Sequence, residues 1–404
     1  MRVIQINTRY KYGGSTGRIV SDLHLLMDKK GIENYVAYGF DFDNVKDKNT
    51  FILENNFELT LSKIYTRIVG THGFQTFGST NRLLNLLDQI KPDVIHLHNI
   101  HNHYINVEKL FTYLKKHSEI KVIWTLHDCW AFTGWCAYFD YIGCYKWQKE
   151  CNNCPALKEY PHTWFFDHSR SNFFRKKKAF LGIKNMTIVT PSIWLKNMVK
   201  QSFLKDYNTV VINNGIDLDL FRNAKYTREE LGIPNNKFII LALADGLQTR
   251  KGAKYLLELP QMLEENEILV VAGVKPNEVK KLNKKNCIPL LYSNDIYYLA
   301  SLYCHADVFI NPTLSDNFPT TNLEALACGT PVITFNTGGS PEAIDKQCGY
   351  VVEQGDITSL IRCIKDVKSK KKETFTIYCR NKATINYDKW KQFEKYITLY
   401  NKSI

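Results

Sequence analysis

The sequence predicts an α/β fold in which two domains are built around parallel sheets. Short apolar runs with β-branched residues alternate with helix-like segments through both halves of the chain. The stretch 307–342 contains a complete strand–helix–strand unit, the connection that parallel sheets use. With 404 residues, the chain is long enough for two or three domains with large cores.

Strands and helices of the first half are expected where apolar residues run together or recur every three to four positions. The expected strands are 3–7, 35–38, 94–98, 122–126 and 187–190. The expected helices follow the glycine-rich loop 10–18 and then cover 81–90, 169–181 and 191–199. Residues 54–80 are rich in aromatic and basic side chains, so an irregular flap on the acceptor side is expected there.

The second half repeats the same α/β rhythm. The expected strands are 238–244, 268–272, 288–291, 307–311 and 332–335. The expected helices cover 294–304, the segment after Pro319, 357–367 and 388–400, and Gly338-Gly339 should open another. In the last of them, apolar residues at helical spacing indicate a docking face: Trp390, Phe393, Ile397 and Tyr400.

Two acids mark the strand–helix–strand unit. Asp316 lies in the loop after the first strand, and Glu324 lies one turn into the following helix. Open parallel sheets bind ligands at the carboxyl ends of their strands, so both acids are candidates for ligand contacts. Taken alone, they would be read as a helix-capping aspartate and a solvated glutamate.

Other strand ends carry candidate residues as well. A glycine-rich turn that includes Gly14 can let backbone N–H groups approach a phosphate, although such turns often serve geometry only. Arg250 and Lys251 follow the strand 238–244, where two cations can neutralise a diphosphate.

The histidines of the first half also lie at strand ends. His96 and His98 share one face of their strand and are expected to form hydrogen bonds rather than to bind a metal. His127 ends the strand 122–126 and is either a site residue or a loop histidine satisfied by its neighbours.

Cysteines gather between residues 129 and 155. Four of them have the spacing C-x7-C-x6-C-x2-C, namely Cys136, Cys144, Cys151 and Cys154. Four thiolates so spaced in a loop-rich segment predict a structural zinc site, with two disulfides as the alternative. A catalytic metal is not expected, because neither an open coordination position nor a base is evident.

The net charge of +13 predicts attraction to anions. No nucleic-acid motif is present, so a sugar diphosphate or an anionic membrane surface is the expected partner rather than nucleic acid. No apolar run approaches the ~20 residues of a membrane-spanning helix, and the first residues read as a strand rather than a signal peptide. We therefore expect a cytoplasmic protein that touches the inner membrane face.

The stretch from Asp316 through Glu324 to Pro331, followed by Gly338-Gly339, resembles the nucleotide-sugar signature of family-4 retaining glycosyltransferases of the GT-B fold. The segments PDVIHLHN, TLHD and NNGID match further landmarks of that family. The resemblance implies two Rossmann-like domains that face each other across a cleft, with a C-terminal helix crossing back to the first domain. The expected ranges are 1–215 with a Cys-rich insert at 129–155, 216–385, and a terminal helix at 386–404.

The resemblance also implies roles for the candidate residues. Lys251 and Arg250 would stabilise the leaving diphosphate, so that catalysis needs no cofactor. Asp316 and Glu324 would bind sugar and ribose hydroxyls. The same resemblance implies donor contacts for Gly14, Asn317 and Phe318 and a catalytic position for His127. Two departures from the family pattern stand out: Asp316 replaces the usual glutamate, and Gly246 stands about where an arginine is usual.

The activity implied is transfer of a sugar from a nucleotide-diphosphate donor to a glycan or lipid-linked acceptor, with retention of configuration. With no obvious nucleophile, a front-face route is expected, in which the leaving phosphate helps to deprotonate the acceptor. Two alternatives remain open from the sequence. One is a non-catalytic nucleotide- or glycan-binding protein of the same fold, and the other is a GT-B nucleotide-sugar epimerase.

Overall fold

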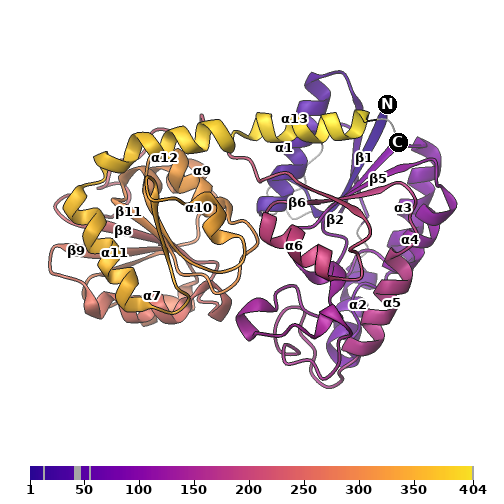
Figure 1. The fold of residues 1–404 in the computed structure, drawn as a ribbon, viewed down its shortest axis with the longest axis horizontal. Coiled ribbons are helices and arrows are strands. Elements are labelled where there is room, and N and C mark those ends of the chain that lie inside the picture. Colours follow the sequence, from indigo (N-terminus) through magenta and orange to yellow (C-terminus); the bar gives the residue numbers. More distant parts are fainter. Residues whose placement is uncertain (12–13, 41–46, 54–55, 403–404) are drawn as a thin grey trace. The chain divides into compact units, whose positions relative to one another are not determined.

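The computed structural model describes residues 1–11, 14–40, 47–53 and 56–402 (Figure 1). The chain divides into two compact units. Unit 1 comprises Met1–Asn213 together with Phe393–Ile404, and unit 2 comprises Asn214–Gln392. The last helix, α13 (Lys389–Asn401), begins in unit 2 and ends in unit 1, which confirms that the terminal helix returns to the first domain.

Unit 1 contains a seven-stranded parallel sheet with the strand order β3-β2-β1-β4-β5-β6-β7. Its strands are β1 (Arg2–Arg9), β2 (Glu33–Phe40), β3 (Thr50–Ile52), β4 (Val94–Leu97), β5 (Lys121–Thr125), β6 (Met186–Thr190) and β7 (Asn208–Val211). Its helices are α1 (Ser15–Lys29), α2 (Asn56–Val69), α3 (Phe77–Ile90), α4 (Val107–Lys116), α5 (Ser169–Phe180) and α6 (Ile193–Gln201).

Unit 2 contains a six-stranded parallel sheet with the order β10-β9-β8-β11-β12-β13. Its strands are β8 (Phe238–Leu243), β9 (Glu267–Val274), β10 (Cys287–Leu291), β11 (Val308–Asn311), β12 (Val332–Phe335) and β13 (Gly349–Val352). Its helices are α7 (Ala253–Glu258), α8 (Val279–Leu282), α9 (Ile296–His305), α10 (Thr320–Ala327), α11 (Ile357–Lys370) and α12 (Glu373–Asn386).

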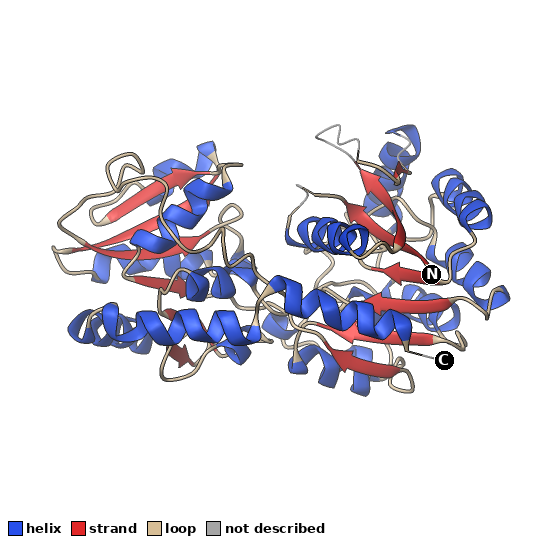
Figure 2. Ribbon diagram, turned by 90° about the horizontal axis from the view of Figure 1, so that it is seen from above, coloured by secondary structure: helices blue, strands red, loops and turns tan. Residues whose placement is uncertain are grey.

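The central strands are apolar because helices flank each sheet (Figure 2). Every residue of β4, β11 and β12 is buried, as their near-continuous apolar sequences predict. Within unit 1, the end of α13 packs on the sheet, where the Tyr400 hydroxyl lies 2.7 Å from Nδ1 of His96. Phe393, Ile397 and Tyr400 are buried and Trp390 is half-buried, which confirms a docking face for the first three.

Two expectations about elements were wrong. Residues 54–80 are not an irregular flap, because 56–69 form α2 and Phe77 begins α3. Gly338-Gly339 does not open a full helix but precedes one 3-10 turn, Ser340–Ala343. None of the helices in the described part of the chain is both long and apolar enough to span a bilayer.

Candidate functional site

Two loops of unit 2 meet at the carboxyl ends of the neighbouring strands β8 and β11. The N–H of Leu314 donates to the carbonyl of Arg250 at 2.8 Å, which ties one loop to the other. Nζ of Lys251 then lies 2.5 Å from Oδ2 of Asp316. Two sequence-predicted site residues, 65 positions apart, therefore form an ion pair at the edge where parallel sheets bind ligands.

Glycines allow these loops to approach so closely. Gly252 has φ +79°, and a Cβ there would lie 2.0 Å from the carbonyl oxygen of Pro312. Gly338 has φ +54°, and a Cβ there would lie 2.0 Å from the carbonyl oxygen of Asp316. Both positions thus require glycine for conformation and for space.

The charge at this edge is positive around one ionised acid. The Lys251 side chain is 30% exposed and that of Asp316 is 14% exposed. Burial is the largest influence on the pKa of Asp316 and raises it, but the charges of Lys251 and Arg250 and the hydrogen bonds to Asp316 together hold it below its usual value. Arg250 also donates to the carbonyl of Ser315 at 2.7 Å, so its guanidinium braces the loop that carries Asp316.

The residues after Asp316 support this loop. The N–H of Asn317 donates to Oδ1 of Asp316 at 2.9 Å. Phe318 is buried, with its ring centroid 5.7 Å from that of Tyr387 and its carbonyl accepting from Asn214 at 2.9 Å. The Phe318 ring packs into the core of unit 2, and donor contacts for Asn317 and Phe318 stay predictions.

Glu324 lies on the inner face of α10. Its side chain is only 1% exposed, and its Oε2 accepts a hydrogen bond from the Tyr303 hydroxyl at 2.9 Å. It is therefore not the solvated helix glutamate of the simplest sequence interpretation. The buried phenol fixes the carboxylate, as expected for a group that must hold one orientation.

A hydrogen-bonded network beneath the loops was not predicted. Asn322 links β11 to the turn after Gly339, because it accepts from Asn311 at 2.8 Å and donates to the Ser340 carbonyl at 3.1 Å. The Thr334 hydroxyl donates to the Asn311 carbonyl at 3.0 Å and lies 2.6 Å from that of Ser340. The sequence signal was available, since these polar residues interrupt otherwise apolar segments and must find partners when buried.

In unit 1, Gly14 lies in the loop that follows β1, and His127 lies in the loop that follows β5. Gly14 caps α1 with φ +86°, and its carbonyl accepts from the N–H of Arg18 at 3.2 Å. Tyr12 and Gly13 of the same loop lie outside the described residues. A Cβ at Gly14 would meet nothing within 4 Å, so the glycine serves the backbone conformation rather than close packing.

His127 belongs to a cluster of histidines at the carboxyl ends of β4 and β5. Its Nε2 lies 3.1 Å from Nδ1 of His98, and the two rings stack with centroids 5.4 Å apart. Burial, only partly offset by Asp128, lowers the pKa of His127 to about 4, so the ring is neutral at pH 7. His96 and His98 form the hydrogen bonds that the sequence predicts for them.

The sequence interpretation missed His101 and Tyr160 as neighbours of this cluster. Nε2 of His101 lies 3.0 Å from Oδ2 of Asp128, and its Nδ1 lies 3.0 Å from the Tyr160 hydroxyl. The run HNIHNHY after β4 was a signal for His101. Tyr160 comes from a distant loop and could not be placed without the fold.

Three thiols of the cysteine-rich segment lie near that of Cys136. Burial raises the pKa of the Cys136 thiol, and the nearby Cys154, Cys151 and Cys144 raise it further. The N–H of Gly134 points at Sγ of Cys151, 3.2 Å away. Among the residues that the structure describes, however, no three or more histidine, cysteine or acidic side chains are arranged so that they could hold a metal ion.

The segment also has a core that the sequence interpretation overlooked. Few aliphatic residues are available, but large aromatic side chains are fully buried there: Trp130, Phe132, Trp135, Phe139 and Trp147. The buried side-chain amine of Lys176, whose pKa burial lowers well below its ordinary value, donates to the carbonyls of Trp130 at 2.8 Å and Thr133 at 3.0 Å. Aromatic burial can therefore stabilise this segment without a metal.

Zinc in this segment stays a prediction. If Cys136, Cys144, Cys151 and Cys154 bind zinc, purified protein should carry close to one equivalent of zinc per chain. Elemental analysis of protein kept under reducing conditions measures this, and Cys154→Ser should remove the metal. The same substitution at Cys287, a buried cysteine of unit 2, serves as the control. Metal-free protein that folds normally would contradict the zinc prediction.

Two family models match the chain. The model for Glycosyltransferase Family 4 matches residues 16–220, and the model for Glycosyl transferases group 1 matches residues 224–382.

Relatives and solved structures agree with these matches. WcaC of Escherichia coli K12, named as a colanic acid biosynthesis glycosyl transferase, is 24% identical over 388 residues that cover 90% of each chain. An Escherichia coli UDP-Gal:alpha-D-GlcNAc-diphosphoundecaprenol alpha-1,3-galactosyltransferase is 26% identical over 270 residues, which are 61% of this chain and 69% of the relative. Sucrose-phosphate synthase from Thermosynechococcus elongatus shares the fold, with a TM-score of 0.73 at 15% identity over 99% of this chain and 98% of the other. The protein therefore belongs to Glycosyltransferase Family 4 and is a glycosyltransferase with the GT-B fold.

Proposed function

We propose that the protein transfers a sugar from a nucleotide-diphosphate donor to a hydroxyl of a glycan or lipid-linked acceptor, with retention of configuration. The observation that carries this proposal is the pairing of Lys251 with Asp316 beside Arg250, at the carboxyl edge of the unit 2 sheet. Two fixed cations there can neutralise the charge that develops on a leaving diphosphate. One relative is named for a UDP-sugar donor and a diphosphoundecaprenol-linked acceptor, which supports the same classes of substrate here.

Each residue of the site has a distinct task in this proposal. Lys251 stabilises the departing diphosphate, while Asp316 orients Lys251 and accepts a hydrogen bond from a sugar hydroxyl. Arg250 adds positive charge and holds the loop in place. Glu324, fixed by Tyr303, accepts a hydrogen bond from a ribose hydroxyl. With both cations in place, the leaving group needs no metal cofactor.

The residues of unit 1 serve the transfer differently. His127 is neutral at pH 7, so its imidazole can donate a hydrogen bond to a sugar hydroxyl or accept one from it without adding charge. The loop at Gly14 presents the N-terminus of α1, which favours a phosphate or a hydroxyl oxygen. For a lipid-linked acceptor, the protein would touch an anionic membrane surface peripherally.

Incubation with UDP-, GDP-, ADP- and CMP-sugars tests the proposal. One nucleotide should raise the melting temperature, and its sugar should be transferred, or slowly released to water, with the anomeric configuration of the donor. NMR of the new anomeric proton reports that configuration. Donor binding without any release of nucleotide would instead indicate a non-catalytic binding protein, and an inverted product would contradict retention.

We expect Glu324→Gln to weaken donor binding by about 1–3 kcal/mol, because it removes a charged hydrogen-bond acceptor. Glutamine keeps the side-chain size and an oxygen for Tyr303, so the fold of α10 should be preserved. Calorimetry with the nucleoside diphosphate gives the affinity. The matched control is Glu353→Gln, whose carboxylate accepts a hydrogen bond from Asn336 at an exposed site. Equal affinities for the Glu324→Gln variant and the unchanged protein would contradict the proposed role of Glu324.

A further inference from the structure

Helix α2 in unit 1 has the reverse of the usual amphipathic arrangement. The residues it buries are the polar Ser62 and Thr66, whose hydroxyls lie 3.2 Å and 3.4 Å from Nδ1 of His103. Large apolar side chains of the same helix are 38% to 72% exposed: Phe57, Leu61, Ile64, Tyr65 and Ile68. A surface helix normally turns its apolar stripe toward the core. The exposed apolar stripe of α2 is therefore a candidate interaction surface.

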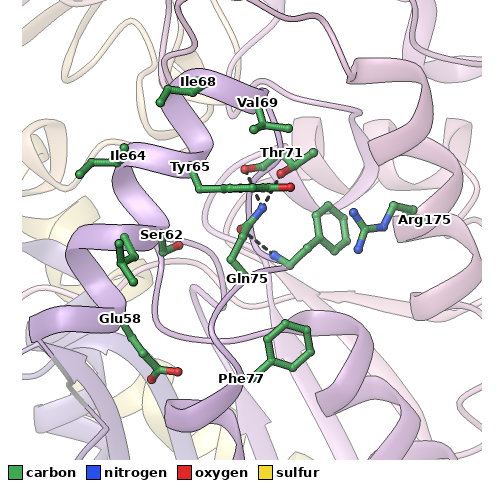
Figure 3. A pocket seen from close by; sticks show the side chains of 12 residues that line it. Glu58, Ser62, Ile64, Tyr65, Ile68, Val69, Thr71, Gln75, Phe77 and Arg175 are labelled. Carbon is green, nitrogen blue, oxygen red and sulfur yellow. Dashed lines mark hydrogen bonds between the residues drawn. The ribbon is translucent and has the colours of Figure 1, made fainter.

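A groove runs beside this helix. Its volume is about 660 Å³, and it lies between α2, the start of α3 and Arg175 on α5. Figure 3 shows Tyr65 reaching from α2 across the groove toward Thr71 and Gln75, with Arg175 on the far side. Apolar groups from both walls, including Ile68, Phe74 and Phe77, line the space, which therefore suits hydrocarbon.

Three consecutive aromatic residues extend the apolar surface. Trp164, Phe165 and Phe166 are 54% to 70% exposed. They are fixed to the end of α2, because the N–H of Trp164 donates to the Arg67 carbonyl at 2.6 Å. Nδ1 of His168 also lies 2.5 Å from the Val69 carbonyl oxygen. The aromatic residues therefore adjoin the C-terminal end of α2. We call them, together with the exposed apolar side chains of α2, the α2 face.

Positive charge borders the α2 face. Lys63 and Arg67 are exposed on α2, and the Arg67 guanidinium lies 5.6 Å from the ring centroid of Trp164. The single acid of α2, Glu58, accepts hydrogen bonds from the N–H groups of Gly78 at 2.6 Å and Ser79 at 2.8 Å, at the start of α3. Aromatic rings next to arginine and lysine are typical of surfaces that lie at the headgroup level of a membrane.

We propose that the α2 face docks on an anionic lipid bilayer, with Leu61, Ile64 and Trp164 entering the interface and Lys63 and Arg67 contacting lipid phosphates. This inference deepens the proposed function, on which it rests for the lipid-linked acceptor. A symmetric contact with a second copy is disfavoured, because it would bring the same cations of both copies together. A single lipid tail in the groove would leave the outer apolar residues and the aromatic loop uncovered.

Co-sedimentation with vesicles tests the docking. The unchanged protein should bind vesicles that contain phosphatidylglycerol, bind vesicles of phosphatidylcholine alone far less, and detach as salt is added. Ile64→Glu and Trp164→Ser should each weaken binding by about tenfold or more, because they remove apolar contact at the interface. The matched control is Ile377→Glu on α12 of unit 2, where the isoleucine is 63% exposed, against 47% for Ile64.

The outcomes separate docking from activity. Circular dichroism and the melting temperature should show that all three variants fold, since the replaced side chains are exposed. Transfer to a water-soluble acceptor should survive Ile64→Glu, so that loss of vesicle binding without loss of transfer supports the docking face.

Equal vesicle binding by the Ile64→Glu and Ile377→Glu variants, or no vesicle binding by the unchanged protein, would overturn the docking proposal. A dimer that Ile64→Glu converts to a monomer in sedimentation velocity would also overturn it, in favour of a self-interface. Absence of transfer with intact vesicle binding would count against the proposed function alone.

Discussion

Replacing Lys251 with methionine is expected to lower the rate of sugar transfer by on the order of 10²–10³-fold, the usual cost of removing one preorganised charge from a transition state. Methionine keeps the length of the side chain but removes the ammonium that lies 2.5 Å from Asp316. The charge on the diphosphate grows as the glycosidic bond breaks, so the loss should fall on kcat more than on binding of the nucleoside. Steady-state kinetics with the identified donor, together with calorimetry on the nucleoside and its diphosphate, measure the two effects.

The pairing with Asp316 adds a second expectation for the same variant. Lys251 is one of the groups that hold the pKa of Asp316 below its usual value, so the variant should raise that pKa. The Lys251→Met/Asp316→Asn double variant then tests coupling, because two residues that act as one unit give losses that do not add. Lys254→Met is the matched control, since Lys254 lies three residues away, exposed on α7. Equal losses for Lys251→Met and Lys254→Met would show that Lys251 is a surface charge with no part in transfer.

The strand–helix–strand unit at 307–342 could be predicted because its signals are local. Apolar runs mark β11 and β12, while Pro319 and Gly329 limit the helix between them. The pairing of Lys251 with Asp316 could not be predicted from local signals, because it depends on β8 and β11 being neighbours in the sheet. Strand order arises from packing over long sequence distances, so both residues were predicted as site residues but not as partners.

The segment 54–80 shows where pattern reasoning fails for a physical reason. The apolar residues of α2 recur at helical spacing, but basic residues lie among them, and this mixed composition predicts a flap rather than a helix. Reasoning from periodicity assumes that a helix buries its apolar stripe, whereas α2 buries Ser62 and Thr66 instead. The core of the cysteine-rich segment was missed because buried tryptophans were not counted as core-forming residues there.

Acid should destabilise unit 1 well before unit 2. Ten of the eleven histidines lie in unit 1, and His305 is the one in unit 2. Burial lowers the pKa of His103 and of His127 to about 4. Burial also lowers the pKa of His72, His96 and His98 well below the ordinary value. The charges around His103 (Lys63, Arg67 and His101) act in the same direction, and only Asp128 opposes burial at His127.

The sign follows from proton linkage. Between pH 6.5 and about 4 the unfolded chain binds protons at these histidines and the folded unit does not, so the free energy of unfolding falls as the pH falls through this range. At pH 5, His103 and His127 should each cost about 2 kcal/mol of stability, against a total of about 5–15 kcal/mol for a typical domain. Hydrogen exchange at pH 7 and pH 5, corrected for the intrinsic rates, should therefore show loss of protection in unit 1 and much less in unit 2.

His103→Asn provides the control for this expectation. His103 has φ +72°, a conformation that asparagine tolerates, and asparagine can still form hydrogen bonds with Ser62 and Thr66. The variant should lose about 2 kcal/mol less than the unchanged protein between pH 7 and pH 5, because it lacks one group that must stay neutral in the folded unit. Unchanged protection of unit 1 at pH 5 would mean that these histidines accept protons without unfolding. The neutral His127 on which the proposed transfer depends would then have to be reconsidered, because acid would charge the ring in the folded protein.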